Sequence, residues 1–112
     1  MKKIEAIIKL VTVDKVIDAL VRVGVSGVTL MQIQGRGRQK GHCELDRGDD
    51  HVVNLLTKVK LEVLAPEERI GEIIRTLQTA AYTGRIGDGN IFVRPVEGVI
   101  RIRTGERGAR AV

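Results

Sequence analysis

The chain has almost no aromatic residues. Only Tyr82 and Phe92 make up the 2% aromatic fraction, and tryptophan is absent. Proteins that bind single-stranded nucleic acid usually interleave basic residues with aromatic rings on which bases stack, so this scarcity speaks against a nucleic-acid partner. Because 43% of the residues are nevertheless hydrophobic, the core must be aliphatic, which suits helices packed on a sheet.

Cysteine and long apolar runs are also scarce. The single cysteine, Cys43, cannot form an internal disulfide, and no run is long enough for a signal peptide or a membrane span. We therefore expect a cytoplasmic protein. His42, Cys43 and His51 could be drawn as metal ligands, but their spacing matches no common metal site.

What is present is one domain of 112 residues with a formal net charge of +5. The charge predicts acidic partners, among which nucleic acids, nucleotides and small polyacids all qualify. Charge alone does not choose among them.

The hydrophobic pattern alternates between the two-residue period of strands and the longer period of helices. It predicts strands at 3–10, 27–35, 58–64 and 90–96, a short fifth strand at 99–103, and helices at 12–24 and from 66 to about 82. This order is the ferredoxin-like βαββαβ arrangement of the α+β class, with a four-stranded antiparallel sheet and two helices on one face. Thr12 is expected to cap the first helix, Pro66 to begin the second, and Gly84 to end it in a left-handed conformation.

The face of the sheet without helices carries apolar residues. In the predicted strands these are Ile7, Met31, Ile33 and Leu64. An exposed apolar face favours self-association.

The connection between the second and third strands, residues 36–55, is unusually long. It has roughly twenty residues where a hairpin needs about two to five. Its charges nearly cancel, and we expect a mobile arm built for contact.

The segment TGRIGDGNIFV, residues 83–93, combines three glycines with the start of a strand. On one interpretation Gly84 caps the helix while Gly87 and Gly89 only make a turn. On the other the glycines form a backbone nest whose N–H groups approach phosphate oxygens.

Two further basic stretches accompany the glycines. In a strand Arg101 and Arg103 would share one face and could bind one polyphosphate together, although an ordinary solvated face is the alternative. The second is GRGRQKG, residues 35–41, whose glycines leave the backbone around Arg38, Gln39 and Lys40 unobstructed by side chains.

Taken together, KKIEAIIK, GRQKGH, KVKLE, TGRIGDGNIFV and VIRIRTGE, in this order and spacing, are similar to the signatures of one family. The chain resembles the PII signal-transduction proteins over nearly all of its length. The resemblance implies a homotrimer with three lateral clefts that bind ATP or ADP, in which magnesium–ATP permits binding of 2-oxoglutarate.

The family's functional segments fall at 36–55 (T-loop), 82–90 (glycine-rich B-loop) and 101–112 (C-terminal loop). The T-loop of such proteins docks onto an ammonium transporter, a nitrogen-metabolism enzyme or a transcription regulator. A cytoplasmic protein would reach the membrane through such a transporter.

The resemblance also implies site residues. Those expected around the nucleotide are Thr29, Gly37, Arg38, Gln39, Leu64, Gly87, Asp88, Gly89, Asn90, Arg101 and Arg103. Those expected around 2-oxoglutarate are Gln39, Lys40, Gly41 and Lys58, with Gln39 also binding magnesium.

The sequence departs from the family pattern at five positions. His51 replaces the tyrosine that is usually uridylylated, so no modification is expected there, and Asp46 replaces a second tyrosine. Asn90 replaces a lysine, which removes a positive charge from the phosphate region. Arg36 and Leu10 stand where many relatives have phenylalanine and proline.

The chain is therefore expected to be a non-enzymatic sensor of nitrogen, carbon and energy status. The alternative is a PII-like adenylate sensor that does not respond to 2-oxoglutarate, which Asn90 favours and the retained Lys58 and Gln39 oppose. A nucleic-acid-binding domain rests on charge alone, and a nucleotide hydrolase lacks a base in the sequence.

Overall fold

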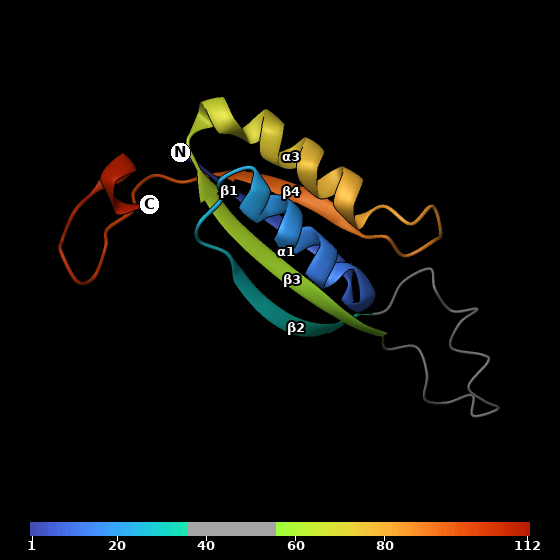
Figure 1. The fold of residues 1–112 in the computed structure, drawn as a ribbon. Coiled ribbons are helices and arrows are strands. Elements are labelled where there is room, and N and C mark those ends of the chain that lie inside the picture. Colours follow the sequence, from blue (N-terminus) through green and yellow to red (C-terminus); the bar gives the residue numbers. More distant parts are fainter. Residues whose placement is uncertain (36–55) are drawn as a thin grey trace.

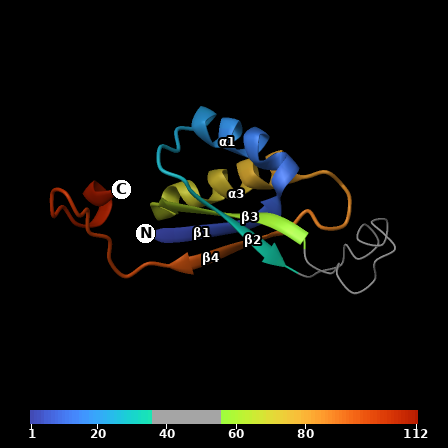
Figure 2. The same cartoon turned by 90° about the horizontal axis from the view of Figure 1, so that it is seen from below.

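The computed structural model describes residues 1–35 and 56–112. Over these residues both helices cover the same face of a sheet (Figures 1 and 2). The elements are β1 (Lys2–Lys9), α1 (Val13–Arg22), β2 (Thr29–Gly35), β3 (Leu56–Ala65), α3 (Glu67–Ala81) and β4 (Asn90–Pro95), with short 3-10 helices at Leu10–Thr12 and Gly108–Ala111.

The four-stranded sheet has the order β2-β3-β1-β4, and every neighbouring pair is antiparallel. The predicted ferredoxin-like fold is confirmed. Alternation in the sequence explains the pairing, because Ile4 of β1 lies opposite Val63 of β3 and Val93 of β4 on the helix side of the sheet.

The core is aliphatic, as the composition predicts. Val16 and Leu20 from α1 and Ile73 and Leu77 from α3 are buried together with Leu61 of β3. Burying one such side chain contributes about 1.5–3 kcal/mol to the free energy of folding. The core therefore fixes the helices on one face and leaves the other face of the sheet open.

A side chain joins the two helices at one end. Arg69, in the first turn of α3, donates a hydrogen bond to the carbonyl oxygen of Val23, just past the end of α1, and its Nη2 lies 2.6 Å from Glu72 Oε1. Gly24 follows with a φ of 88°, which turns the chain toward β2.

Several predicted boundaries were wrong. Leu10 lies outside β1 and is 49% exposed instead of facing the core. The hydroxyl of Thr12 donates to the carbonyl of Lys9 at 2.9 Å and does not cap α1. Pro66 precedes α3 as its N-cap, and α3 ends at Ala81, so Gly84 belongs to the following loop and does not cap the helix.

The predicted fifth strand at 99–103 was also wrong. Residues 102–104 form a turn, and pairing is limited to an isolated bridge between Ile100 and Arg107. Ile102 is fully exposed, so this short segment has no buried face to hold it in a sheet. Glycine at position 105, with a φ of 74°, lets the chain turn back.

The open face carries the apolar residues that the sequence predicts there. In the observed register Met31 and Ile7 both lie opposite Lys60, and Ile33 lies opposite Lys58, on the face away from the helices. Phe92 of β4 shares this face and is 46% exposed.

A buried carboxylate sits in the middle of this face. The side chain of Glu5 is 7% exposed, and its oxygens lie 3.4 Å from Lys3 Nζ, 3.3 Å from Lys60 Nζ and 3.2 Å from Arg94 Nε. Burial raises the pKa of Glu5, but the hydrogen bond from Lys60 and the charge of Arg94 outweigh it and hold the pKa below its ordinary value.

Within the described residues, no helix is long and apolar enough to cross a membrane.

Glu5→Gln should lower the free energy of unfolding at pH 7, because three cations lose their common partner. Since folding depresses the pKa of Glu5, its stabilisation is complete above the ordinary value of 4.5 and is lost as the pH falls through the folded value. Urea unfolding of the parent and of Glu5→Gln between pH 7 and pH 3 should therefore converge in acid. The exposed Glu97→Gln is the control, and curves for Glu5→Gln and the parent that stay parallel throughout would contradict the assignment.

Candidate ligand site at the two ends of the sheet

The loop between α3 and β4 requires its glycines. Gly84, Gly87 and Gly89 have φ values of 85°, 98° and 106°, a region that other residues rarely adopt. A Cβ built on Gly89 would lie 1.6 Å from the carbonyl oxygen of Ile7. Gly87 and Gly89 therefore make the turn as the first interpretation expects, although Gly84 does not cap the helix, and β4 leaves the loop in direct backbone contact with β1.

Asp88 holds this loop together from inside. Its Oδ2 accepts hydrogen bonds from the backbone N–H of Thr83 at 2.9 Å and of Gly84 at 3.0 Å, and its Oδ1 accepts from the Thr83 hydroxyl. These bonds, with the Thr83 hydroxyl first among them, hold the pKa of Asp88 well below its usual range. The carboxylate thus stays charged at any physiological pH.

Two lysines from neighbouring strands reach the same loop. Lys58 of β3 donates to the carbonyl oxygen of Gly87 at 2.5 Å, and Lys9 of β1 lies 3.2 Å from Asp88 Oδ1. Burial lowers the pKa of Lys58, the nearby Lys9 lowers it further, and Asp88 opposes both. Half-buried ammonium groups beside a glycine-rich backbone form an environment suited to an anion.

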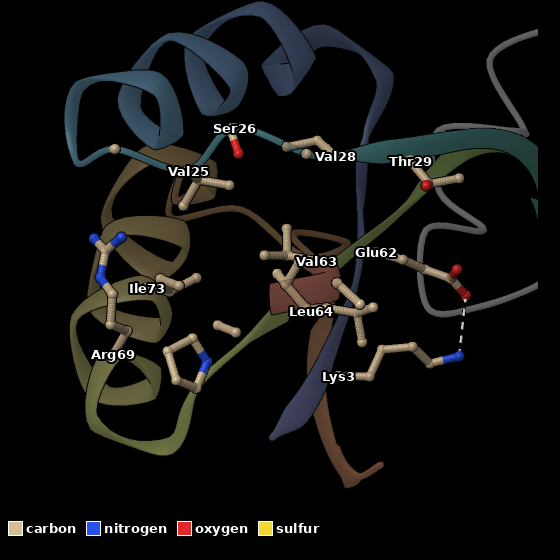
Figure 3. Close-up of a pocket in the computed structure, with 16 residues that line it drawn as sticks. Lys3, Val25, Ser26, Val28, Thr29, Glu62, Val63, Leu64, Arg69 and Ile73 are labelled. Carbon is tan, nitrogen blue, oxygen red and sulfur yellow. Dashed lines mark ion pairs between the residues drawn. The ribbon is translucent and has the colours of Figure 1, made fainter. Parts of the chain in front are cut away.

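A cleft of about 510 Å³ lies at the other end of the sheet (Figure 3). Thr29 of β2 and Leu64 of β3 both line it, with Val63 and Ile73 at its apolar floor. An ion pair of 3.5 Å between Lys3 Nζ and Glu62 Oε2 stands at its edge. The C-terminal Ala111 and Val112 close another side.

Arg101 and Arg103 belong to the C-terminal segment, whose last residues, Ala111 and Val112, line this cleft. The segment and the loop occupy opposite ends of the sheet in both views (Figures 1 and 2). Because the segment forms no strand, the expectation that the two arginines share a strand face was wrong. Arg101 instead closes the turn, with its backbone N–H donating to Glu106 O at 2.8 Å and its guanidinium 3.5 Å from Glu106 Oε1.

One chain thus carries the predicted site residues in two separate groups. The first group is Lys58, Gly87, Asp88, Gly89 and Asn90. The second is Thr29, Leu64, Arg101 and Arg103. Gly37, Arg38, Gln39, Lys40, Gly41 and His51, together with His42 and Cys43, lie outside the described residues.

The chain matches one family over almost its whole length. The sequence model described as "Nitrogen regulatory protein P-II" covers residues 1–106. The chain belongs to this family. "Nitrogen regulatory protein P-II" of Azospirillum brasilense is 55% identical over 112 residues, and that of Haemophilus influenzae is 51% identical, each covering 100% of both chains.

A solved P-II structure shares the fold. Arabidopsis thaliana PII bound to citrate superimposes with a TM-score of 0.80 at 37% identity, covering 99% of this chain and 91% of that one. The family consists of regulatory proteins, and this P-II chain is accordingly a signal-transduction protein and not an enzyme.

Two residues that hold the glycine-rich loop were missed by sequence reasoning. Lys9 and Thr83 both contact Asp88, and Lys9 Nζ also donates to the Thr83 hydroxyl at 3.1 Å. Thr83 could have been found from its place five residues before Asp88 across a glycine turn. Nothing local in the sequence points from Lys9 to a loop more than seventy residues away.

Gly89→Ala should destabilise the P-II fold strongly. A left-handed conformation alone costs an L-residue about 1–2 kcal/mol, and the contact with Ile7 O must add to it by displacing β4 from β1. We expect a loss above about 3 kcal/mol in urea unfolding. The matched control is Gly108→Ala, which has a φ of 69° but no atom within 4 Å of the added Cβ. Equal losses of stability in both variants would show that the close approach of Gly89 to the carbonyl of Ile7 adds nothing to the cost of the substitution.

Proposed function

We propose that this P-II protein binds ATP or ADP between subunits of a homotrimer, and 2-oxoglutarate when magnesium–ATP is bound. The separation of the two residue groups within one chain is the observation that supports this best. From Lys58 to Leu64 strand β3 advances six residues, or roughly 20 Å at about 3.3 Å per residue. Two adjacent chains can place the loop end of one sheet beside the cleft end of the other, so that both ends reach one nucleotide over a shorter distance.

Each end supplies a different part of the site. The apolar cleft with Thr29 and Leu64 suits the adenine ring, and the C-terminal segment, which carries Arg101 and Arg103, extends from the same end of the sheet. The glycine-rich loop with Lys58 suits the phosphates of a nucleotide whose adenine lies in the cleft of the neighbouring subunit. Gly37 and Arg38 complete the phosphate contacts.

The open face of the sheet is where the subunits associate. It combines partly exposed apolar residues, Met31 and Phe92 among them, with the Glu5 ion-pair network. Covering such a face in a closed trimer removes apolar surface from water, which drives association.

The 2-oxoglutarate site lies beside the glycine-rich loop. Lys58 now donates to Gly87 O, and a ligand carboxylate would offer it a charged acceptor in the same region. Gln39, Lys40 and Gly41 supply the remaining contacts. Magnesium prefers oxygen ligands and retains phosphate and water, so a single amide oxygen from Gln39 is sufficient protein ligation.

The output passes through the T-loop, residues 36–55. Nucleotide and 2-oxoglutarate select among its conformations because they bind them unequally, and a target protein reads the result. The target class is an ammonium transporter, a nitrogen-metabolism enzyme or a transcription regulator, so the protein works in the cytoplasm and at the membrane only through its partner. His51 lacks the phenolic hydroxyl needed for uridylylation.

A second candidate function is an adenylate sensor that ignores 2-oxoglutarate. Asn90 favours it, because this exposed residue at the start of β4 brings no charge to the phosphate end.

Calorimetric titration with ATP, ADP and 2-oxoglutarate, each with and without magnesium, separates the two functions. We expect 2-oxoglutarate to bind only when magnesium and ATP are both present. Gln39→Ala should abolish that binding while largely sparing ADP. Nucleotide binding without any 2-oxoglutarate binding in the parent would select the adenylate sensor, and no nucleotide binding at all would refute both.

Asn90→Lys should tighten ATP binding. Adding one cation beside the phosphates is expected to lower Kd about tenfold, or ~1.4 kcal/mol, and less for ADP. Asn90→Gln, which lengthens the side chain without charge, is the control. An equal gain for Asn90→Gln would assign the effect to side-chain length.

A further inference from the structure

The position of Lys9, where β1 meets the glycine-rich loop, is not explained by the proposed nucleotide site alone. It is the last residue of β1, its side chain is only 14% exposed, and its Nζ lies 3.2 Å from Asp88 Oδ1 and 3.1 Å from Thr83 Oγ1. The ammonium thus faces into the loop and not toward the solvent that a strand-end lysine usually meets.

The carboxylate that Lys9 contacts, that of Asp88, already accepts three hydrogen bonds from its own loop. Asp88 accepts hydrogen bonds from the backbone N–H groups of Thr83 and Gly84 and from the Thr83 hydroxyl, all of them neutral donors. Its side chain is 25% exposed, so water screens its charge only partly. Within residues 1–35 and 56–112, Lys9 is the cation that forms an ion pair with it.

Lys58 lies directly across the sheet from Lys9. The two are register partners on β1 and β3, and each ammonium holds a different part of the loop, Lys9 the carboxylate and Lys58 the carbonyl of Gly87. Asp88 is also close enough to Lys58 to stabilise its charged form. Among the residues that the structure describes, Lys58 is therefore the alternative partner for the carboxylate if Lys9 is lost.

We propose that Lys9 is a positioning residue that neutralises Asp88, so that Lys58 and the glycine-rich backbone stay available to an anionic ligand. This inference rests on the proposed function for its ligand. Without Lys9 the carboxylate has two effects of the same sign: it attracts the ammonium of Lys58 and it repels phosphate oxygens. Both effects grow with the negative charge of the ligand.

The charge dependence gives a test that a merely structural role would fail. Lys9→Met should weaken ATP binding about tenfold or more, weaken ADP binding less, and leave adenosine binding unchanged. Lys9→Arg, which keeps the charge, should restore ATP binding. Lys15→Met, at an exposed position on α1, is the control for removing a lysine elsewhere.

A second substitution separates charge from geometry. Asp88→Asn in the Lys9→Met background removes the unbalanced charge, while the amide oxygen still accepts from the loop N–H groups and the amide nitrogen donates to the Thr83 hydroxyl. This double variant should recover most of the lost ATP affinity. Calorimetry on the intact protein measures all of these affinities.

Two results would overturn the inference. One is unchanged ATP affinity in Lys9→Met, and the other is an equal loss for ATP, ADP and adenosine that Asp88→Asn does not repair. If the parent binds no nucleotide, the proposed function fails, and the inference is judged on the free protein. There the amide resonances of Thr83 and Gly84 should shift in Lys9→Met and return in Lys9→Arg, and unmoved resonances would overturn it.

Discussion

The contact between Gly89 and the carbonyl of Ile7 is the constraint on which the ligand site depends. It brings β4 against β1 so closely that only a residue without a side chain fits. With β4 fixed there, the loop before it lies over the ends of β1 and β3, where Lys9 and Lys58 can reach it. The glycines therefore make the tight turn that places the loop backbone beside two cations.

The sheet also separates the two groups of predicted site residues from each other. Strand β3 carries Lys58 near one end and Leu64 near the other. The C-terminal segment lies beyond the end of the sheet that carries Leu64. Under the proposed function, a nucleotide that contacts both groups lies between two chains. The open face, with its buried Glu5 network and exposed Phe92, provides a surface on which such chains can associate. The proposed assembly and ligand binding thus both depend on the separation of the two groups along the sheet.

The sequence predicted the order of helices and strands along the chain and the core well, because alternation in β1 and β3 and the helical spacing in α1 and α3 are strong, local signals. It failed where a tertiary contact decided the outcome. The segment at 99–103 has the residue pattern of a strand but no partner strand beside it, so it turns instead. The bonds that the carboxylate of Asp88 accepts from Thr83 and Gly84 of its own loop are likewise a tertiary detail that the resemblance did not indicate. Lys9 was missed because its partners are distant in sequence.

The central claim is that one ligand site needs opposite ends of two chains, and mixing two defective chains tests it most directly. Leu64→Glu damages only the cleft end, and Lys58→Glu damages only the loop end. Each variant alone should bind no ATP. If they are unfolded and refolded together in equal amounts, a trimer assembled at random should regain about a quarter of the ATP sites of the parent. No recovery in a mixture shown to form mixed trimers would contradict the account, because it would place the whole site within a single chain.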